Sequence, residues 1–456
     1  MKNTKRRLEV LSFYDSTGIV AHLEKMALKG WALERISNSI WRYRRVEPKK
    51  LRYAAVYLPS SSEFDPGPTE ANRELQEFCA RAGWVQVGSL AQMHIFCSES
   101  ENPIPIETEP MVQIETIHRA MKKNFLPSQI CMLVLGILQM AMQLWTLIDD
   151  PLDYLSSAAK LVGSVCWVLV IAMSVNDIVK YYRWRKKAIP AAEDGEFLPT
   201  EGSQRFQYVC LVILAAALAG WLLSISDGAQ LLIVGLSFGL LSLVFAAVFG
   251  IKALFKKLGL AAGVTRAAVW ITAIVMSFAY AGGIVFVAMQ AAEHNWFEGD
   301  VETYSDGYFT FEVHHDELPL NVEDLMETDY DRFSTQLDEQ GTFLLTITQC
   351  SQQARSGEWG GNDLAYTICD VRLPLLKKLA WNEMIWPYNN PEDLESPMEL
   401  RRLEIGTGDV SVYQLYDADL AWNVYFLHYD ARFVKLCPDW SFTDGQLLTA
   451  ADILAP

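Results

Sequence analysis

The stretch Cys131–Trp145 reads CMLVLGILQMAMQLW and contains no charged residue. A bilayer core of about 30 Å is crossed by roughly 20 apolar residues in a helix. Five stretches of about that length follow one another, and they predict five transmembrane helices over Leu126–Ile148, Leu161–Val179, Tyr208–Ile225, Ala229–Phe249 and Ala267–Met289. A buried helix of a soluble protein is the alternative for any single stretch, but five in succession favour a multi-pass membrane protein.

The charges of the loops predict the orientation of these helices. Lys122 and Lys123 precede the first stretch, whereas the segment DDPLDYLSS after it carries only acids. Basic residues return after the second and fourth stretches, at Lys180, Arg183, Arg185, Lys186, Lys187, Arg205, Lys252, Lys256, Lys257 and Arg266. Because cytoplasmic loops are enriched in Lys and Arg, we expect a cytoplasmic N-terminus and, after five spans, an extracytoplasmic C-terminus. The opening MKNTKRRLEV lacks the apolar core of a signal peptide, which also favours a cytoplasmic N-terminal part.

The acidic residues are concentrated after the last predicted span. The whole chain has a formal net charge of −17, to which residues 1–124 contribute +3, residues 125–289 contribute +2 and residues 290–456 contribute −22. The acidic segment is either a soluble surface or a site that attracts cations or a basic partner. Its charge excludes nucleic-acid binding through phosphate contacts, which need a basic surface.

These patterns divide the chain into four parts. We expect a cytoplasmic domain over residues 1–103, a linker and juxtamembrane helix over 104–125, the five spans within 126–289, and an extracytoplasmic α+β domain over 290–456. In the first part, RRLEVLSFY, SIWRYRRV, LRYAAVYL and VQVGSLAQMHIFC are typical of strands, while GIVAHLEKMALKG and ELQEFCARAG are typical of helices. This order predicts a ferredoxin-like βαββαβ domain. LKGW at 28–31 and RAGW at 81–84 form an internal echo in which Gly caps each helix.

Three segments of this region resemble a known family. FYDSTGIVAHLEKMALKGW, PKKLRYAAVYLPSSSEFDPGPTEAN and AQMHIFCSESENPIPIETEP are similar to the bacterial domain-of-unknown-function 2812 family, over about Phe13–Glu109. The resemblance implies an N-terminal cytoplasmic domain ahead of several membrane helices, and a regulatory setting near PadR-type transcriptional regulators. It implies no catalytic residue, because none is established for the family.

A basic cluster surrounds the predicted hairpin of this domain. It consists of Arg42, Arg44, Arg45, Lys49, Lys50 and Arg52. One interpretation is a docking patch for anionic lipid headgroups or for a cytoplasmic protein partner. The other is a solvated strand face without a partner.

Two features connect this domain to the membrane. NPIPIETEP is extended by its prolines, and the apolar stripe Met111, Ile114, Ile117 and Met121 then predicts a juxtamembrane helix. That helix either lies along the inner leaflet or packs on the cytoplasmic domain. The sequence alone leaves both arrangements open.

Polar groups within the spans are few. Gln139 and Gln143 share one face of the first span, and Asn176 and Asp177 lie near the inner end of the second, beside Lys180. We expect hydrogen bonds between helices or interface positions rather than a transport pathway, which would need several ionisable groups. Gly235 and Gly239 form a GxxxG that allows close helix approach and self-association.

The last part has the pattern of an α+β domain. YFTFEV, TFLLTITQC, SVYQLYD, WNVYFLHYD and RFVKLC are typical of strands, and the helices LPLLKKLAWNEMIW and TDGQLLTAADIL are expected, the second capped by Thr443. The three cysteines of this part, Cys350, Cys369 and Cys437, could include one disulfide or could all be free buried thiols. The sequence contains no metal-ligand cluster, cofactor motif or catalytic motif that we can assign, and adjacent His314, His315 and Asp316 do not form one.

Three classes of function are consistent with these features. The leading hypothesis is a non-enzymatic sensor or signal relay that links an external domain to a cytoplasmic domain. The second is an accessory subunit of a transporter or channel. The third is an extracytoplasmic enzyme, which would need a pocket within residues 300–456 with convergent carboxylates and a histidine.

Overall fold

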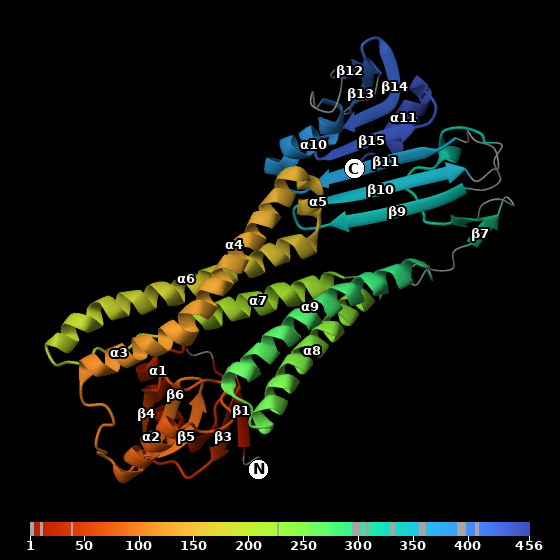
Figure 1. Cartoon of the computed structure of the whole chain (residues 1–456). Coiled ribbons are helices and arrows are strands. Elements are labelled where there is room, and N and C mark those ends of the chain that lie inside the picture. The colour runs from red at the N-terminus through yellow and green to blue at the C-terminus, as the bar shows by residue number, and fades with distance from the viewer. Residues whose placement is uncertain are drawn as a thin grey trace. The chain divides into compact units, whose positions relative to one another are not determined.

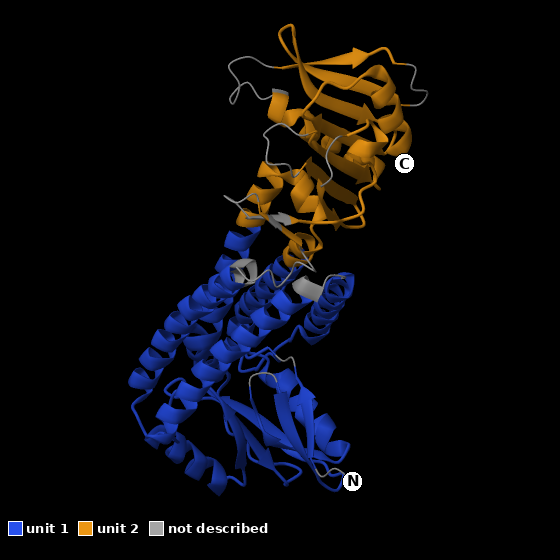
Figure 2. Cartoon of the chain, turned by 90° about the vertical axis from the view of Figure 1, so that its right-hand side faces the viewer, with its two compact units in different colours: residues 1–140, 165–294 blue, residues 141–164, 295–456 orange. Residues whose placement is uncertain are grey.

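In the computed structural model, the chain forms two compact units. One comprises residues 1–140 and 165–294, and the other comprises residues 141–164 and 295–456 (Figure 2). The structure describes the chain except for residues 1–3, 10–11, 38–39, 226–227, 294–301, 306–309, 329–332, 355–361, 390–397 and 406–409.

The N-terminal domain consists of two successive strand–helix–strand–strand halves. The first half contains β1 (Thr4–Leu8), α1 (Ser16–Leu28), β2 (Trp31–Arg35) and β3 (Ile40–Arg45). The second contains β4 (Arg52–Tyr57), α2 (Glu70–Arg81), β5 (Val85–Leu90) and β6 (Met93–Ser98). Each half forms an antiparallel three-stranded sheet with its last strand in the centre, in the orders β1-β3-β2 and β4-β6-β5.

The expected ferredoxin-like topology is therefore not confirmed. A βαββαβ chain has four strands in one sheet, whereas the described residues of this domain form six strands in two sheets. The internal echo instead marks a tandem repeat, because Gly30 and Gly83 occupy the same place in the two halves. Both have the left-handed backbone that favours glycine, with φ values of 79° and 82°.

The middle of the chain is helical. α3 (Pro110–Ala120) continues through one π-helical turn, Met121–Phe125, into α4 (Leu126–Asp149), as Figure 1 shows. The other helices of this part are α5 (Pro151–Ser156), α6 (Ala158–Glu193), α7 (Gln204–Ser224), α8 (Gly228–Lys257) and α9 (Ala262–Glu293). All five predicted spans are thus helical, and the second helix is longer than the expected Leu161–Val179.

The surface of these helices is that of a membrane protein. In the most apolar windows of α8 and α9 no residue is buried within the chain, and in the other three helices at most 11% are buried. Exposing so large an apolar surface to water is unfavourable, whereas the hydrocarbon core of a bilayer accommodates it. The chain is therefore a multi-pass membrane protein.

The close approach of two helices is seen at Gly136 rather than at the GxxxG of α8. A Cβ on Gly136 of α4 would lie 2.7 Å from Ile171 Cγ1 of α6, so Gly136 permits the close approach of these helices. A Cβ on Gly235 or Gly239 would meet no described atom within 4 Å. The GxxxG of α8 is therefore unused by described residues of this chain, and self-association through it stays a prediction.

The C-terminal domain is built on an antiparallel sheet of seven strands in the order β12-β13-β14-β15-β11-β10-β9. Its strands are β9 (Phe333–Gly341), β10 (Leu345–Ala354), β11 (Leu364–Val371), β12 (Glu399–Leu403), β13 (Ser411–Asp417), β14 (Leu420–His428) and β15 (Arg432–Pro438). Two short strands, β7 (Glu302–Ser305) and β8 (Thr310–Val313), form a separate hairpin.

Helices complete the C-terminal domain. α10 (Lys377–Asn389) and α11 (Asp444–Ile453) belong to two apolar cores that contain Phe433 and Leu447 respectively. Thr443 caps α11, as expected, by accepting a hydrogen bond from the Gln446 N–H at 3.3 Å. All eight cysteines are free thiols, and of the three in this domain Cys350 and Cys369 are buried.

Candidate functional site: the junction of the N-terminal domain with the membrane helices

The N-terminal domain is joined to the membrane helices by a buried polar and aromatic cluster, here called the junction. It is formed by residues 12–18 at the start of α1, by Asp177–Trp184 of α6 and by residues 198–207, which lead into α7. These three segments are far apart in the sequence. Their contacts all lie within the first unit.

Asp15 is the N-cap of α1 and also holds the segment that precedes α7. The residue is 2% exposed, and its carboxylate accepts hydrogen bonds from the Gly18 N–H at 3.0 Å and from Thr200 Oγ1 at 2.8 Å. Thr17 and Thr200 bond to each other twice, each backbone N–H donating to the other's hydroxyl, at 3.0 and 3.1 Å. Burial raises the pKa of Asp15, while the bonds from Thr200 and Gly18 and the charge of Lys180 oppose that rise. Asp15 thus fixes both the helix start and the inter-helix loop.

Asp177 is the centre of the second part of the junction. Its side chain accepts hydrogen bonds from Ser203 Oγ at 2.6 Å and from Gln207 Nε2 at 2.8 and 3.0 Å. Ser12 of the N-terminal domain donates a longer one at 3.4 Å. We expected hydrogen bonds between helices or positions at the membrane interface. The bonds from Gln207 link α6 with α7, and the other partners come from the turn before α7 and from the N-terminal domain. Asp177 therefore joins three elements.

An aromatic cluster fills the space beside these carboxylates. The rings of Tyr14 and Tyr181 are fully buried, with centroids 5.5 Å apart in an edge-to-face arrangement. Phe125 and Trp184 complete the cluster, and the Trp184 indole N–H donates to Leu198 O at 3.1 Å. Edge-to-face pairs contribute about 0.5–1.5 kcal/mol each beyond the burial of their area. The junction is therefore a packed core.

The juxtamembrane helix belongs to this core. Ile114, Ile117 and Met121, three members of the predicted apolar stripe, are buried against the N-terminal domain. The helix therefore packs on protein, which resolves the alternative that the sequence left open. In the π-helical turn, Lys123 Nζ donates to Pro59 O at 2.8 Å and to Ser61 O at 3.3 Å. Such turns occur often at functional positions in helices.

The predicted basic cluster is only partly a free cationic surface. Arg42 pairs with Glu34 at 2.9 Å, Lys49 with Glu99 at 2.5 Å and Arg52 with Glu24 at 3.6 Å. Arg44, Arg45 and Lys50 are exposed. The six residues do not form one patch, because half of them are neutralised by acids on other elements.

The other polar residues that the sequence singled out have minor roles in the described geometry. Gln139 and Gln143 are half-buried on α4. Asn176 stands beside Asp177, but its buried Nδ2 has no hydrogen-bond partner among the described residues. Lys180 Nζ donates to Gly202 O at 3.4 Å and so contributes to the junction.

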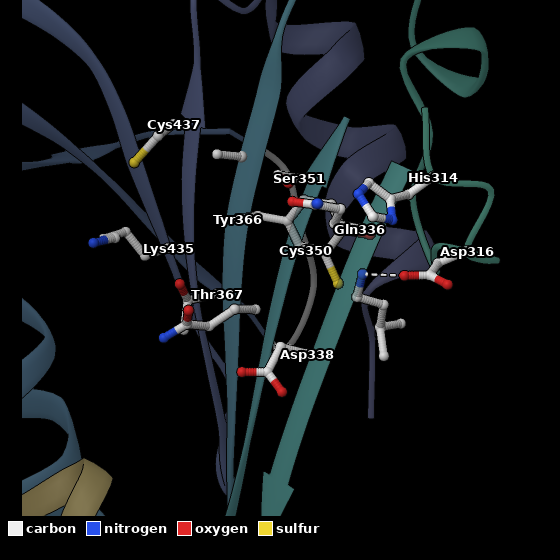
Figure 3. Close-up of a pocket in the computed structure, with 13 residues that line it drawn as sticks. His314, Asp316, Gln336, Asp338, Cys350, Ser351, Tyr366, Thr367, Lys435 and Cys437 are labelled. Carbon is white, nitrogen blue, oxygen red and sulfur yellow. Dashed lines mark hydrogen bonds between the residues drawn. The ribbon is translucent and has the colours of Figure 1, made fainter. Parts of the chain in front are cut away.

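The C-terminal domain contains a separate hollow of about 480 Å³ on its sheet. Asp338, Gln349, Thr367 and Lys435 are aligned across four adjacent strands of its lining. His314 and Asp316 lie at its other end, and Figure 3 shows the Asp316 carboxylate bonded to the Leu337 N–H, at 2.9 Å. The histidine and the two carboxylates lie apart in this view rather than together on one point. No group of three metal-ligating side chains is found among the described residues.

Glu107 provides a pH-dependent element in the linker. It lines a groove of about 500 Å³ between α1, β4 and the linker, and burial raises the pKa of its carboxyl to about 7. The folded chain then retains a proton that the unfolded chain has lost above about pH 4.5, so stability falls as the pH rises from about 4.5 to about 7. The pKa shift corresponds to a loss of at most about 3 kcal/mol in the free energy of unfolding. Because the side chain is partly exposed, the actual loss is smaller.

Replacing Glu107 should remove this pH dependence. We expect Glu107→Gln to unfold at a higher temperature than the wild type near pH 8 and at a similar temperature near pH 5. Glu101→Gln, which removes an exposed carboxyl just before the linker, is the matched control and should follow the wild type. Thermal unfolding of the full-length protein in detergent measures this, and a Glu107→Gln advantage of equal size at both pH values would contradict the assignment.

The comparisons with known proteins identify the family of the N-terminal part. Residues 16–128 match the sequence model of a family described as "Protein of unknown function (DUF2812)". No curated protein and no solved structure matches the chain. The match reaches from α1 into the first turn of α4, so it includes Lys123 and Phe125 but ends before Asp177, Thr200, Ser203 and Gln207. The resemblance read from the sequence is thereby confirmed: residues 16–128 are a DUF2812 domain, attached in this chain to five membrane helices.

Proposed function

We propose that this protein is a non-enzymatic sensor or signal relay, in which the C-terminal domain is linked to the DUF2812 domain through α6. The observation that carries the proposal is that α6 belongs to both units. Residues 158–164 pack within the second unit, whereas the rest of the helix, including Asp177, belongs to the first. A rigid helix shared by two packed cores is a physical element through which one can bias the other.

The first turns of α6 are held by the C-terminal domain. Tyr154 of α5 hydrogen-bonds to Ser164 of α6, and Lys160 pairs with Asp153. Leu152 packs against the apolar core that contains Val371 and Phe433. Thr342, between β9 and β10, donates its hydroxyl to Leu155 O at 2.7 Å. A ligand that shifts these strands would therefore act on the α5–α6 corner.

The other end of α6 is embedded in the DUF2812 domain. Tyr181 and Ala188 are fully buried in the core of that domain, and Trp184 is 6% exposed. Any rotation of α6 would change the hydrogen bonds of Asp177 and the packing of Tyr181 together. These contacts support a relay rather than two independent domains on one anchor.

The relay is tested by weakening the external contact and observing the junction. Thr342→Val keeps the shape of the side chain but removes the bond to Leu155 O and the bond from the Leu344 N–H. We expect it to increase amide hydrogen exchange of residues 12–18 and 198–207 by about 3-fold or more. Thr348→Val, on the following strand β10, is the matched control and should leave the junction unchanged. The relay would be wrong if Thr342→Val accelerated exchange around α5 and β10 only. Co-purification of a pore or nucleotide-binding subunit would instead favour an accessory subunit.

We also propose that the DUF2812 domain is cytoplasmic and the C-terminal domain extracytoplasmic. Within the first unit, the DUF2812 domain contacts the basic ends of the spans, for example through Lys252 and Glu63 at 2.7 Å. Within the second unit, the C-terminal domain contacts the acidic loop after the first span. These pairings support the orientation given by the positive-inside rule.

The orientation is measured with two epitope tags. In intact cells, a tag after Pro456 should be accessible to an antibody or a protease, and a tag before Met1 should become accessible only after permeabilisation. Protection of the C-terminal tag in intact cells would contradict the five-span arrangement.

A further inference from the structure

The outer face of the β1-β3-β2 sheet carries a row of arginines. Arg6 of β1 and Arg35 of β2 are each directly paired with Arg42 of the central strand β3. Directly paired residues project from the same face of a sheet, so the three arginine side chains leave the sheet on one face. The opposite face carries Trp41 and Tyr43, which are buried in the core. On the arginine face Arg6, Arg35 and Arg44 are exposed and Arg42 is half-buried, while Ala32, which is paired with Arg44, is buried.

Like charges on adjacent strands are destabilising unless a partner offsets them. In the described part of the chain, only Arg42 of this row has an ion-pair partner, Glu34, while Arg6 and Arg35 have none. Arg44 adds a fourth cation on the same face, because it follows Arg42 by two residues on β3. The face thus has an excess of three positive charges, which an anionic partner would neutralise.

The apolar end of the same face is located at the membrane. Leu8 and Ile40 are directly paired, share the arginine face and are 51% and 56% exposed. Leu8 O accepts a hydrogen bond at 3.3 Å from the hydroxyl of Tyr208, which lies in the first turns of the membrane helix α7. Exposed Arg205 and Phe206 belong to that same end of α7. The sheet face therefore begins where a span enters the bilayer.

From these placements we infer that the arginine face, defined as Arg6, Arg35, Arg42 and Arg44 with Leu8 and Ile40, binds the headgroups of anionic phospholipids. The two aliphatic side chains enter the interfacial region, and the arginines bond to the phosphates above it. Guanidinium groups suit this ligand, since they pair with phosphate in a bidentate manner. Basic side chains beside a span are attracted to anionic lipid, an attraction that salt weakens.

The inference is tested with a photo-crosslinking amino acid at Ile40 of the full-length protein in vesicles. The vesicles contain phosphatidylcholine alone or a mixture with phosphatidylglycerol, and the crosslinked lipid is identified by mass spectrometry. We expect a preference for phosphatidylglycerol that falls when Arg6→Gln and Arg35→Gln are combined. Each arginine near the membrane surface contributes about 1 kcal/mol of attraction to anionic lipid, so the preference should fall by at most about thirty-fold. Lys29→Gln with Lys50→Gln removes two exposed cations elsewhere on the domain and should leave the preference unchanged.

Several outcomes would overturn the assignment. Equal labelling of the two lipids, or equal losses in both double variants, would leave no specific lipid face. Labelling of protein instead of lipid would make the face a protein interface, and loss of labelling in millimolar inorganic phosphate would indicate a site for free anions. Because both substituted arginines are exposed, thermal unfolding of the variant should match the wild type, which verifies that it is folded.

Discussion

Asp177→Ala should release the DUF2812 domain from α6 and α7. In the wild type Asp177 is 4% exposed, and its carboxylate accepts hydrogen bonds from Ser203, Gln207 and Ser12. Alanine leaves these donors without their acceptor in a site that water enters poorly, and each unsatisfied group costs about 1–3 kcal/mol. We expect the junction to lose about 3–5 kcal/mol, the range found when one partner of a buried charged network is removed.

Amide hydrogen exchange measures this effect locally, which matters because two packed units need not unfold in one transition. Peptides that cover residues 12–18 and 198–207 should exchange at least about 100-fold faster in Asp177→Ala than in the wild type. Asn176→Ala is the matched control at the adjacent position. Its buried amide nitrogen has no partner among the described residues, so its removal should be neutral or slightly stabilising. Comparable effects at both positions would mean that helix packing, rather than the hydrogen bonds, holds the junction.

Asp177→Asn separates the charge from the hydrogen bonds. The amide oxygen can still accept from Ser203, but the amide nitrogen would face the Gln207 side-chain nitrogen, and the charge beside Lys180 would be lost. An intermediate loss is therefore expected. A loss as large as that of alanine would assign the effect to the charge.

The sequence predicted best those elements that one local pattern decides. Five apolar stretches, four of them without a charge and one with Asp177 alone, gave five helices, because the length of an apolar helix that crosses a bilayer is fixed by the thickness of the bilayer. In the C-terminal domain, the strands near Tyr413, Tyr425 and Phe433 and the helix capped by Thr443 follow from alternation and from a capping residue. Each of these signals is contained within about twenty residues.

The N-terminal topology could not be read in the same way. Trp31–Arg35 is a short strand that directly follows a helix cap, and the ferredoxin-like prediction left it out. The segment VQVGSLAQMHIFC was expected to be one strand, but it turns at Ala91, whose φ of 51° is left-handed. Asn-Gly or Asp-Gly is the usual sequence of such a turn, so Ala-Gln gave no signal. Which strands share a sheet depends on pairings between segments that no local pattern specifies.

The junction was missed for a related reason. For Asp177 the sequence predicted a hydrogen bond between helices or a position at the membrane interface, but it did not identify the partners. Its actual partners include Ser12, which is 165 residues away, and Ser203 and Gln207 in a different helix and its leading turn. Ser and Gln are common residues with no motif. Only the role of Asp15 as a helix cap could have been predicted, because an Asp before a helical pattern is a typical N-cap.

Gly202→Ala should disrupt the other half of the junction. A Cβ at this position would lie 1.9 Å from Asp15 Oδ2 and 2.8 Å from Asp15 Cγ. The Asp15 side chain cannot simply move aside, because it caps α1 and accepts the hydroxyl of Thr200, and a Cβ on Gly18 would likewise lie 2.1 Å from the same oxygen. Loss of the cap costs about 1–2 kcal/mol, and loss of the buried bond to Thr200 adds about 1–3 kcal/mol. We therefore expect Gly202→Ala to destabilise the junction by about 2–4 kcal/mol.

The cause can be isolated with a second substitution in the same contact. Asp15→Ser shortens the side chain but retains a capping hydroxyl, so it leaves room for the new methyl group. If the clash with Asp15 is the cause, Asp15→Ser with Gly202→Ala should be less destabilised than the sum of the single variants by about 1 kcal/mol or more. Gly220→Ala, on α7, is the matched control, since its Cβ would meet no described atom within 4 Å and alanine favours a helix. Additive losses would show instead that the clash with Asp15 is not the cause, and Asp15 would then hold the loop through Thr200 alone.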